Sequence, residues 1–247
     1  MRIDAWLTTH GHFSSRQRAQ TAIKTGHVLC NGQPVGKPSQ PVQPNDQIEV
    51  TGDPLRYVSR GGLKLEKAIR TFQLDFLGKR MLDAGASTGG FTECALAHGA
   101  AKVYAVDTGS GQLAASLRTH PQVIFYENFD VRQLNLEQLD GEAVDVIVAD
   151  LSFISLTHVL PAFAALLKPG GFLVLLIKPQ FEMEHRVSLK GGIVKSPAMR
   201  ARAVKRVLDC AASLGFRAKG LRETDVEQDV QKNVEFLAWL ESDLQGQ

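Results

Sequence analysis

Short apolar runs alternate with amphipathic stretches over most of the chain, and this alternation predicts a mostly parallel α/β fold. Seven runs have the length and composition of strands: residues 80–84, 102–106, 123–126, 144–149, 171–177, 216–222 and 234–240. Segments with apolar residues at helical spacing separate most of them, which indicates a doubly wound sheet. A polar loop alone joins the last two runs, so we expect them to form a terminal antiparallel hairpin.

The first part of the chain follows a different pattern. Two short helices are expected within residues 2–25, the second capped by Ser14 or Ser15. An Asn31-Gly32 turn then joins two short strands, and a third strand closes the segment. The pattern therefore predicts three parts: a small α+β module at 1–55, a linker at 56–60 and an α/β domain at 61–247.

Composition and charge limit the function classes. The 247 residues are 44% hydrophobic and 22% charged, as in an ordinary globular protein, and the net charge of +2 leaves any basic surface local. Three cysteines lie far apart and fit neither a disulfide framework nor metal-ligand spacing. No apolar run approaches the roughly 18 residues of a membrane span, and no signal peptide is recognisable. We expect a cytoplasmic protein without a metal or a membrane partner.

A loop with three glycines follows the first strand of the α/β domain, in the string MLDAGASTGGFTE. Such a loop lies at the carboxyl edge of an open sheet, where ligands bind. It lacks the Gly-Lys-Ser/Thr ending of a phosphate-binding P-loop, and its G-x-x-x-G-G spacing differs from the dinucleotide fingerprint. We therefore expect a nucleoside ligand without a pyrophosphate. A glycine-rich turn with no ligand is the alternative.

Three acidic residues stand at the ends of successive strands and refine this prediction. Asp83 could bind the amino group of a methionine moiety, Asp107 a ribose, and Asp130 an adenine amino group, although each could instead be a helix cap or a loop acid. Seven strands ending in a hairpin are typical of S-adenosylmethionine-dependent methyltransferases. The predicted cofactor-binding residues are Asp83, Gly85, Ala86, Ser87, Gly89, Gly90, Phe91, Asp107, Asp130 and Asp150.

Candidate catalytic residues follow the next two strands. The fourth strand ends in Asp150-Leu-Ser-Phe, where base-modifying amino-methyltransferases commonly carry N/D-P-P-Y/F, and the fifth strand ends at Lys178. A single lysine at a strand end is usually a solvated surface group. Beside an aspartate and a cofactor loop it becomes a candidate for catalysis.

Motifs along almost the whole chain resemble the TlyA family. They are RIDAWL and SSRQRAQTAIKTGHVLCNG of an S4-like module, then YVSRGGLKLEKA, LDAGASTGGFT, IVADLSFISL, IKPQFE, GGIVKSPA and NVEFL. One departure is Arg56-Tyr57-Val58, where members often have R-x-W-V. The resemblance implies an S4-like RNA-binding domain before a Rossmann-like, seven-stranded FtsJ-like domain that 2'-O-methylates cytidine ribose in ribosomal RNA. It also carries a Lys-Asp-Lys-Glu tetrad onto Lys64, Asp150, Lys178 and Glu235.

The implied partner is ribosomal RNA or a ribosomal subunit, bound by basic residues. The candidates are Arg2, Arg16, Arg18, Lys24, Arg60, Lys190 and Lys195. For the helix near residue 20 the alternative is a merely solvated face. Residues 182–196 are predicted to be either a mobile loop over RNA or a linker with no role.

The implied chemistry leaves two mechanisms open for Lys178. A ribose hydroxyl becomes a good nucleophile only as its proton leaves, so Lys178 could act as the base. Burial and the charge of Lys64 favour the neutral amine, whereas Asp150 and Glu235 favour the ammonium and hold both lysines in place. In the second mechanism a charged Lys178 only orients the hydroxyl. An RNA-binding assembly protein with a degenerate enzyme domain is a further alternative, and a pore-forming haemolysin is disfavoured.

Overall fold

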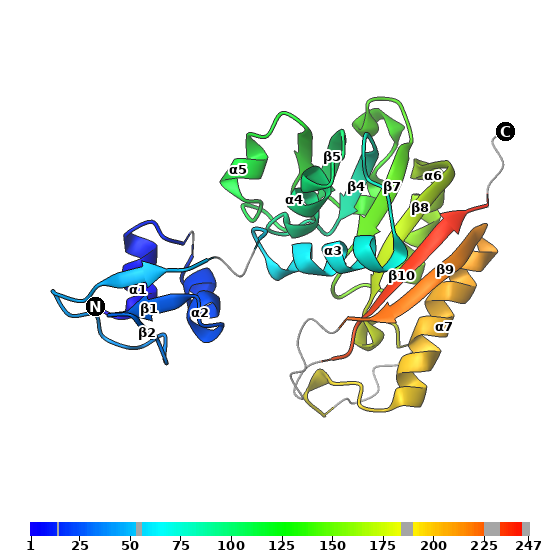
Figure 1. Cartoon of the computed structure of the whole chain (residues 1–247). Coiled ribbons are helices and arrows are strands. Elements are labelled where there is room, and N and C mark those ends of the chain that lie inside the picture. The colour runs from blue at the N-terminus through cyan, green and yellow to red at the C-terminus, as the bar shows by residue number, and fades with distance from the viewer. Residues whose placement is uncertain (14, 53–55, 184–189, 225–232, 244–247) are drawn as a thin grey trace. The chain divides into compact units, whose positions relative to one another are not determined.

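The computed structural model describes residues 1–13, 15–52, 56–183, 190–224 and 233–243. The chain divides into two compact units, Met1–Arg56 and Tyr57–Gln247 (Figure 1), and each is described by itself.

The first unit is the small α+β module that the sequence predicts. Helices α1 (Ile3–Thr9) and α2 (Arg16–Lys24) pack on a three-stranded sheet of order β2-β1-β3, with β1 at Val28–Cys30, β2 at Gln33–Pro34 and β3 at Ile48–Val50. The Ser15 hydroxyl caps α2 by accepting a hydrogen bond from the Arg18 amide. Asn31 and Gly32 both have positive φ, as a tight hairpin turn requires. The alternative cap, Ser14, lies outside the described residues.

A seven-stranded sheet forms the second unit, in the order β6-β5-β4-β7-β8-β10-β9 (Figure 1). The strands are β4 (Arg80–Ala84), β5 (Lys102–Val106), β6 (Val123–Tyr126), β7 (Val144–Ala149), β8 (Leu167–Ile177), β9 (Phe216–Glu223) and β10 (Phe236–Ser242). Only β10 runs antiparallel to its two neighbours, so the predicted terminal hairpin is confirmed. Strand β8 begins four residues earlier than predicted and β10 two residues later.

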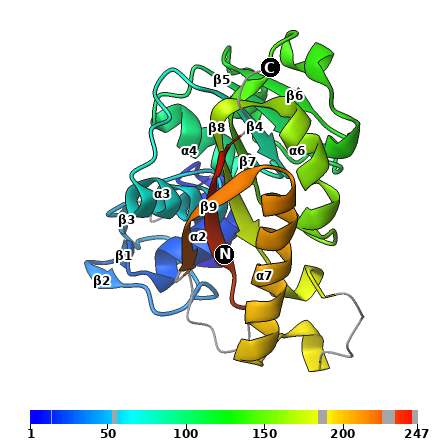
Figure 2. The ribbon, with the colours of Figure 1, turned by 90° about the vertical axis from the view of Figure 1, so that its right-hand side faces the viewer.

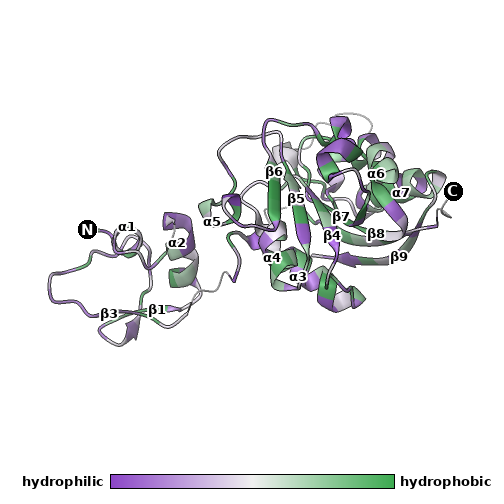
Figure 3. Ribbon diagram, turned by 90° about the horizontal axis from the view of Figure 1, so that it is seen from above, coloured by the Kyte–Doolittle hydropathy of each residue, from purple (hydrophilic) through white to green (hydrophobic). Residues whose placement is uncertain are grey.

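Helices cover both faces of this sheet (Figure 2). They are α3 (Arg60–Phe72), α4 (Gly90–Ala97), α5 (Ala115–Arg118), α6 (Leu160–Leu166) and α7 (Pro197–Ser213). Side chains alternate along β4, so that Met81 packs with α3 and α4 while Leu82 packs with α6 and α7. The central strands β4, β5 and β7 are buried on both sides and are therefore mostly apolar. Figure 3 shows that the edge strand β6 is hydrophobic as well.

Short 3-10 helices lie in the described loops of the second unit. They are η1 (Val131–Gln133), η2 (Leu136–Leu139), η3 (Leu156–His158), η4 (Pro179–Phe181) and η5 (Lys190–Gly192). Among the described residues no helix is both long and apolar enough to cross a membrane.

The second unit begins earlier than the predicted linker allowed. Tyr57 is only 5% exposed and packs in the core with α3 and α4. Its ring lies so close to Gly62 that a Cβ there would come within 2.4 Å of it. Since a buried aromatic side chain fixes the backbone that carries it, the linker expected at 56–60 does not extend past Arg56.

Candidate active site

The carboxyl ends of β4, β5, β7 and β8 bring the predicted residues to one edge of the sheet. Ala84, the last residue of β4, pairs with Val106 on one side and with Ala149 on the other. Strand β10 enters this edge from the opposite direction, because Phe236 pairs with Ile177. Glu235 directly precedes β10 and Lys178 directly follows β8. They therefore lie beside each other at this edge, although they are far apart in the sequence.

The four tetrad residues form two ion pairs there. Lys178 Nζ lies 2.6 Å from Asp150 Oδ1, and Lys64 Nζ lies 2.6 Å from Glu235 Oε2. The Lys64–Glu235 contact is also a hydrogen bond. Lys178 instead donates a hydrogen bond of 2.9 Å to the Ser152 hydroxyl. All four side chains are at most 21% exposed. The expected pairing of two carboxylates with two ammonium groups is thus present, and it leaves the site nearly neutral.

The glycines of the first loop are required by its packing on the rest of the unit. Gly85 and Gly89 have φ of +85° and +94°. A Cβ at Gly85 would lie 2.8 Å from the Asp150 carbonyl oxygen, and one at Gly90 would lie 2.3 Å from Ser59 Oγ. The sequence prediction assigned the glycines to close approach of a ligand. The structure gives a further reason, which is that the loop itself lies against β7 and the start of α3.

Asp83 lies beneath this loop and is fully buried. Its Oδ2 accepts a hydrogen bond of 2.7 Å from Thr92 Oγ1, while Oδ1 has no partner among the described residues. Burial, to which the charge of Asp150 adds, raises the pKa of Asp83 to about 7 although the Thr92 hydrogen bonds oppose the shift. Asp83 therefore packs under the glycine loop, and its Oδ1 stays available to accept a hydrogen bond from a cation.

Asp107 and Asp130 differ in what their carboxylates already bind. Asp107 accepts backbone hydrogen bonds from Ser87 at 2.8 Å and from Gly109 at 2.7 Å, one on each oxygen, and each oxygen keeps a second lone pair. Asp130 caps η1 and forms an ion pair with Arg132, whose hydrogen bonds hold the pKa of Asp130 below its usual range. In the structure Asp130 is thus a helix cap, which is the alternative to an adenine contact.

Ala86, Ser87 and Phe91 complete the loop. Ala86 and Phe91 are buried, in the apolar clusters of the second unit, so they shape the loop rather than line its surface. Ser87 has a positive φ of 48° and donates its hydroxyl to Gln112. Ser87 is therefore the loop residue whose backbone and side chain both connect to the segment after β5.

These residues fit S-adenosylmethionine. A buried carboxylate oxygen without a partner suits the ammonium of its methionine part, and the free lone pairs of Asp107 suit ribose hydroxyls. Because Asp83 is fully buried, an ammonium reaches it only if the loop above shifts. Asp83 and Asp107 would hold the methionine part and the ribose of such a ligand.

The raised pKa of Asp83 predicts how cofactor affinity depends on pH. A raised carboxyl pKa contributes stability that is complete below the unfolded value near 4 and is lost as pH rises through about 7, where the buried group ionises. A bound ammonium favours the ionised form, so affinity should rise about tenfold per pH unit below 7 and level off above it. Calorimetric titration from pH 5.5 to 7.5 measures this. Asp83→Asn should bind with a flat profile, and an equally steep profile in that variant would exclude Asp83 as the titrating group.

Two residues at this edge are absent from the predicted site residues, although Phe153 stands in the Asp150-Leu-Ser-Phe string. Phe153 is 92% exposed and has a positive φ of 66°, and its ring centroid lies 5.2 Å from that of Phe181. Glu182 is 2% exposed, and burial raises its pKa. Both follow predicted catalytic residues by three or four positions, in DLSF and KPQFE, but their local sequence gives no signal of exposure or burial.

Two of the predicted RNA-binding residues of the first unit, Arg2 and Arg16, contact a buried acid. Asp4 is fully buried and accepts hydrogen bonds from Arg2, Arg16 and Gln20 at 2.7–3.1 Å. Burial disfavours its charged form, but these hydrogen bonds outweigh burial and hold the pKa of Asp4 well below its usual range. The side chains of Arg2 and Arg16 nevertheless stay about half exposed. Asp4 thus fixes two guanidinium groups side by side at the surface.

The other basic candidates are more scattered. Lys24 and Arg60 are exposed and Arg18 is half-buried. In the 182–196 segment, residues 184–189 lie outside the described residues, as does the side chain of Lys190, and Lys195 is exposed. Asn233 binds this segment at both the Val194 amide and the Gly192 carbonyl, at 2.7 and 2.8 Å. Residues 192–194 are therefore bound to the segment that leads into β10, two residues before Glu235.

Family models match both units of the chain. An FtsJ-like methyltransferase model matches residues 57–241, and an S4 domain model matches residues 1–48. The chain is 43% identical to the 16S/23S rRNA (cytidine-2'-O)-methyltransferase TlyA of Mycobacterium tuberculosis over 97% of its length and 89% of the relative's. It is 40% identical to Hemolysin A of Brachyspira hyodysenteriae, over 96% and 98% of the two chains.

A solved structure from Streptococcus thermophilus that carries a hemolysin name superimposes on 98% of this chain and 88% of its own, with a TM-score of 0.76 and 38% identity. The match of the two models, in this order and over nearly the whole length, agrees with the fold and with the residues at the sheet edge. The chain belongs to the TlyA family, in which an S4 domain precedes an S-adenosylmethionine-dependent methyltransferase domain of the FtsJ-like type.

Proposed function

We propose that this protein transfers a methyl group from S-adenosylmethionine to the ribose 2'-hydroxyl of a cytidine in ribosomal RNA. The observation that carries the proposal is the pair of ion pairs, Lys178–Asp150 and Lys64–Glu235, beside a glycine loop of the cofactor-binding type. The name of the relative from Mycobacterium tuberculosis supplies the nucleotide and the RNA class. Ribosomal subunits are cytoplasmic, so we propose the same location for the enzyme.

When bound, S-adenosylmethionine supplies an electrophilic methyl group on a sulfonium. The protein must hold the ribose hydroxyl in line with that group and accept or redirect its proton. Lys178 is the candidate for this role because its side chain is only 11% exposed and its Nζ contacts both Asp150 and Ser152. Asp150 fixes the position of Lys178, and Glu235 does the same for Lys64 on the other side.

Phe153 is proposed as the platform for the target base. The Phe153 side chain is 92% exposed at a strained backbone position although its ring contacts that of Phe181, so burial does not explain its position. It lies one residue from Ser152, which receives the hydrogen bond of Lys178. Single-stranded or extruded bases stack on aromatic side chains in this way.

Removal of the Phe153 ring should weaken RNA binding more than it slows the methyl-transfer step. Stacking contributes about 1–3 kcal/mol per base, so Phe153→Ala should raise KM for RNA about tenfold or more, with kcat less affected. Steady-state methyl transfer measures both constants. Leu77→Ala, which removes another exposed apolar side chain, serves as the control. Equal KM values for Phe153→Ala and the wild type would show that the target base does not stack on Phe153.

The proposal is tested by transfer of labelled methyl to unmodified 16S and 23S rRNA and to both subunits, followed by mapping of the modified nucleotide. Label on the 2'-oxygen of a cytidine is the expected result. Label on a base nitrogen or carbon would exclude ribose chemistry. Tight cofactor binding without label on any RNA would favour the RNA-binding assembly protein instead.

A further inference from the structure

A buried carboxylate joins two segments of the candidate active site. Glu182, just after η4, is 2% exposed. Its Oε2 accepts a hydrogen bond of 2.5 Å from the Ser155 hydroxyl, and its Oε1 accepts one of 2.9 Å from the Leu156 amide. Both oxygens are thus bound to the loop that follows β7. A buried charge is retained only where such partners compensate its lost hydration.

The loop that Glu182 binds carries three residues of the site. It begins at Asp150, whose amide is fixed to the Ala84 carbonyl at 3.1 Å, and continues through Ser152 and Phe153. Phe153 combines a positive φ with 92% exposure, so burial does not hold it in this conformation. A strained backbone persists only where its surroundings fix both ends. Ala84 fixes one end, and Glu182 fixes the other.

The backbone of Glu182 is connected to that of Lys178. One 3-10 turn connects the two residues, with hydrogen bonds from the Phe181 amide to the Lys178 carbonyl and from the Glu182 amide to the Pro179 carbonyl. The Glu182 carbonyl in turn accepts a hydrogen bond of 2.9 Å from Arg206 on α7. Glu182 therefore connects the segment of Lys178 to the segment of Asp150 and Ser152, and α7 supports the connection from outside.

We propose that Glu182 is a positioning residue that sets the distance of Lys178 from Asp150 and Ser152 by holding the loop of residues 150–156 on the turn of residues 178–182. It touches none of the reacting atoms. This inference rests on the proposed function, since it concerns the geometry of the methyl-transfer site. A misplacement of about 1 Å in such a site costs on the order of 100-fold in rate.

The test compares Glu182→Ala with Glu182→Gln. Glutamine keeps an acceptor for the Leu156 amide and gains a donor for the Ser155 oxygen, whereas alanine removes both contacts. We expect Glu182→Ala to lower kcat about 30-fold at saturating RNA with the cofactor Kd unchanged, and Glu182→Gln to restore kcat to within about threefold. Asp209→Ala, which removes an exposed carboxylate on α7, is the matched control and should behave as the wild type.

A second variant covers the case in which Glu182→Ala does not fold. Ser155→Ala removes one of the two contacts and leaves no buried charge uncompensated, because the Leu156 amide still donates to Glu182. We expect kcat to fall about threefold in this variant. In the double variant Ser155→Ala with Glu182→Gln the losses should not add, since both changes act on one contact.

Hydrogen exchange separates this inference from the proposed function. Peptides of residues 150–156 should exchange as in the wild type in Glu182→Gln, faster in Ser155→Ala and much faster in Glu182→Ala, while the β4–β5 core stays protected. This readout needs no RNA. If the wild type labels no RNA, the proposed function fails while exchange still tests the contact. Unchanged exchange and wild-type kcat in Glu182→Ala would overturn the inference.

Discussion

Lys178→Ala should lower kcat for methyl transfer at least about 1,000-fold while the cofactor Kd changes less than about twofold. Lys178 Nζ lies 2.6 Å from Asp150 and 2.9 Å from Ser152, at the end of β8, and the glycine loop that we propose for cofactor binding follows another strand, β4. Single-turnover transfer measures the chemical step, and equilibrium titration measures the Kd. Full activity in this variant would remove Lys178 from the mechanism.

The matched control is Lys168→Ala. Lys168 lies on the same strand at its opposite end and pairs with Asp145 at 3.2 Å. Lys168 therefore has the same charge and a similar ion pair, but it lies far from the carboxyl edge of the sheet, where the candidate site is. Its loss should leave kcat unchanged.

Lys178→Arg distinguishes the two mechanisms that the sequence leaves open. Arginine keeps a positive charge with donors but does not lose its proton in proteins. If Lys178 only orients the hydroxyl, the arginine variant should retain much more activity than Lys178→Ala. If Lys178 is the base, both variants should lose activity to a similar extent.

Most of the fold could be predicted because its strands are local patterns. The runs at 80–84, 102–106, 123–126 and 144–149 are short, apolar and bounded by polar residues, and the structure gives each the predicted bounds. Strand β8 begins before the predicted start, although Pro169 and Gly170 are ordinary turn signals. Its first residue, Leu167, pairs with Val144, and the register then shifts before Phe172 pairs with Val146. Only the neighbouring strand determines that.

The identity of the tetrad followed from family motifs, but its pairing did not. Lys64 and Glu235 are 171 positions apart, and only the packing of α3 beside β10 brings them together. Likewise nothing local indicates that Glu182 is buried or that Phe153 is exposed. Asp130 illustrates the opposite case, because its partner Arg132 is two residues away and the predicted adenine contact has to compete with it.

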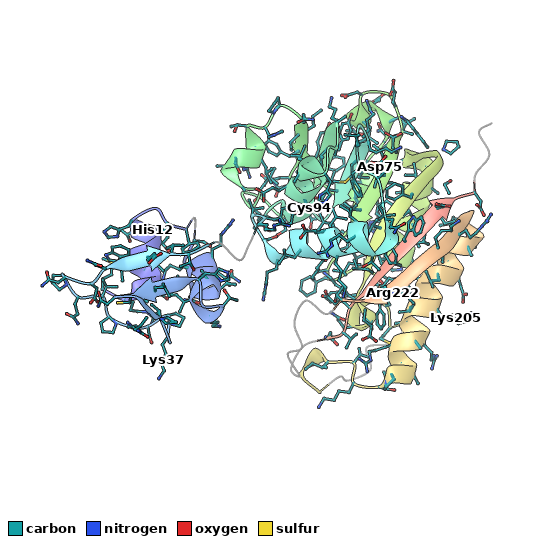
Figure 4. All side chains as sticks on the ribbon, viewed as in Figure 1. His12, Lys37, Asp75, Cys94, Lys205 and Arg222 are labelled. Atoms are coloured by element: carbon teal, nitrogen blue, oxygen red, sulfur yellow. The ribbon has the colours of Figure 1, made fainter. Side chains whose placement is uncertain are left out.

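Asp107→Ala should raise the Kd of S-adenosylmethionine at least about 100-fold. Hydrogen bonds to a charged group contribute about 1.5–3 kcal/mol each, and two ribose hydroxyls would donate to this carboxylate. The measurement is calorimetric titration of the full chain. Asp75→Ala is the control, because Asp75 also accepts a backbone hydrogen bond in a turn, from Leu77 at 2.9 Å, but lies before β4 at the other end of the sheet (Figure 4).

Asp107 has a structural role as well, and ligand fragments separate the two. Its contacts with the Ser87 and Gly109 amides shape the glycine loop, so a higher Kd alone does not identify a ribose contact. Adenosine contains the ribose and methionine does not. If Asp107 binds the ribose, Asp107→Ala weakens adenosine binding and leaves methionine binding unchanged. Equal losses for both fragments would mean that Asp107 acts only through the loop, and an unchanged Kd for S-adenosylmethionine would exclude both roles.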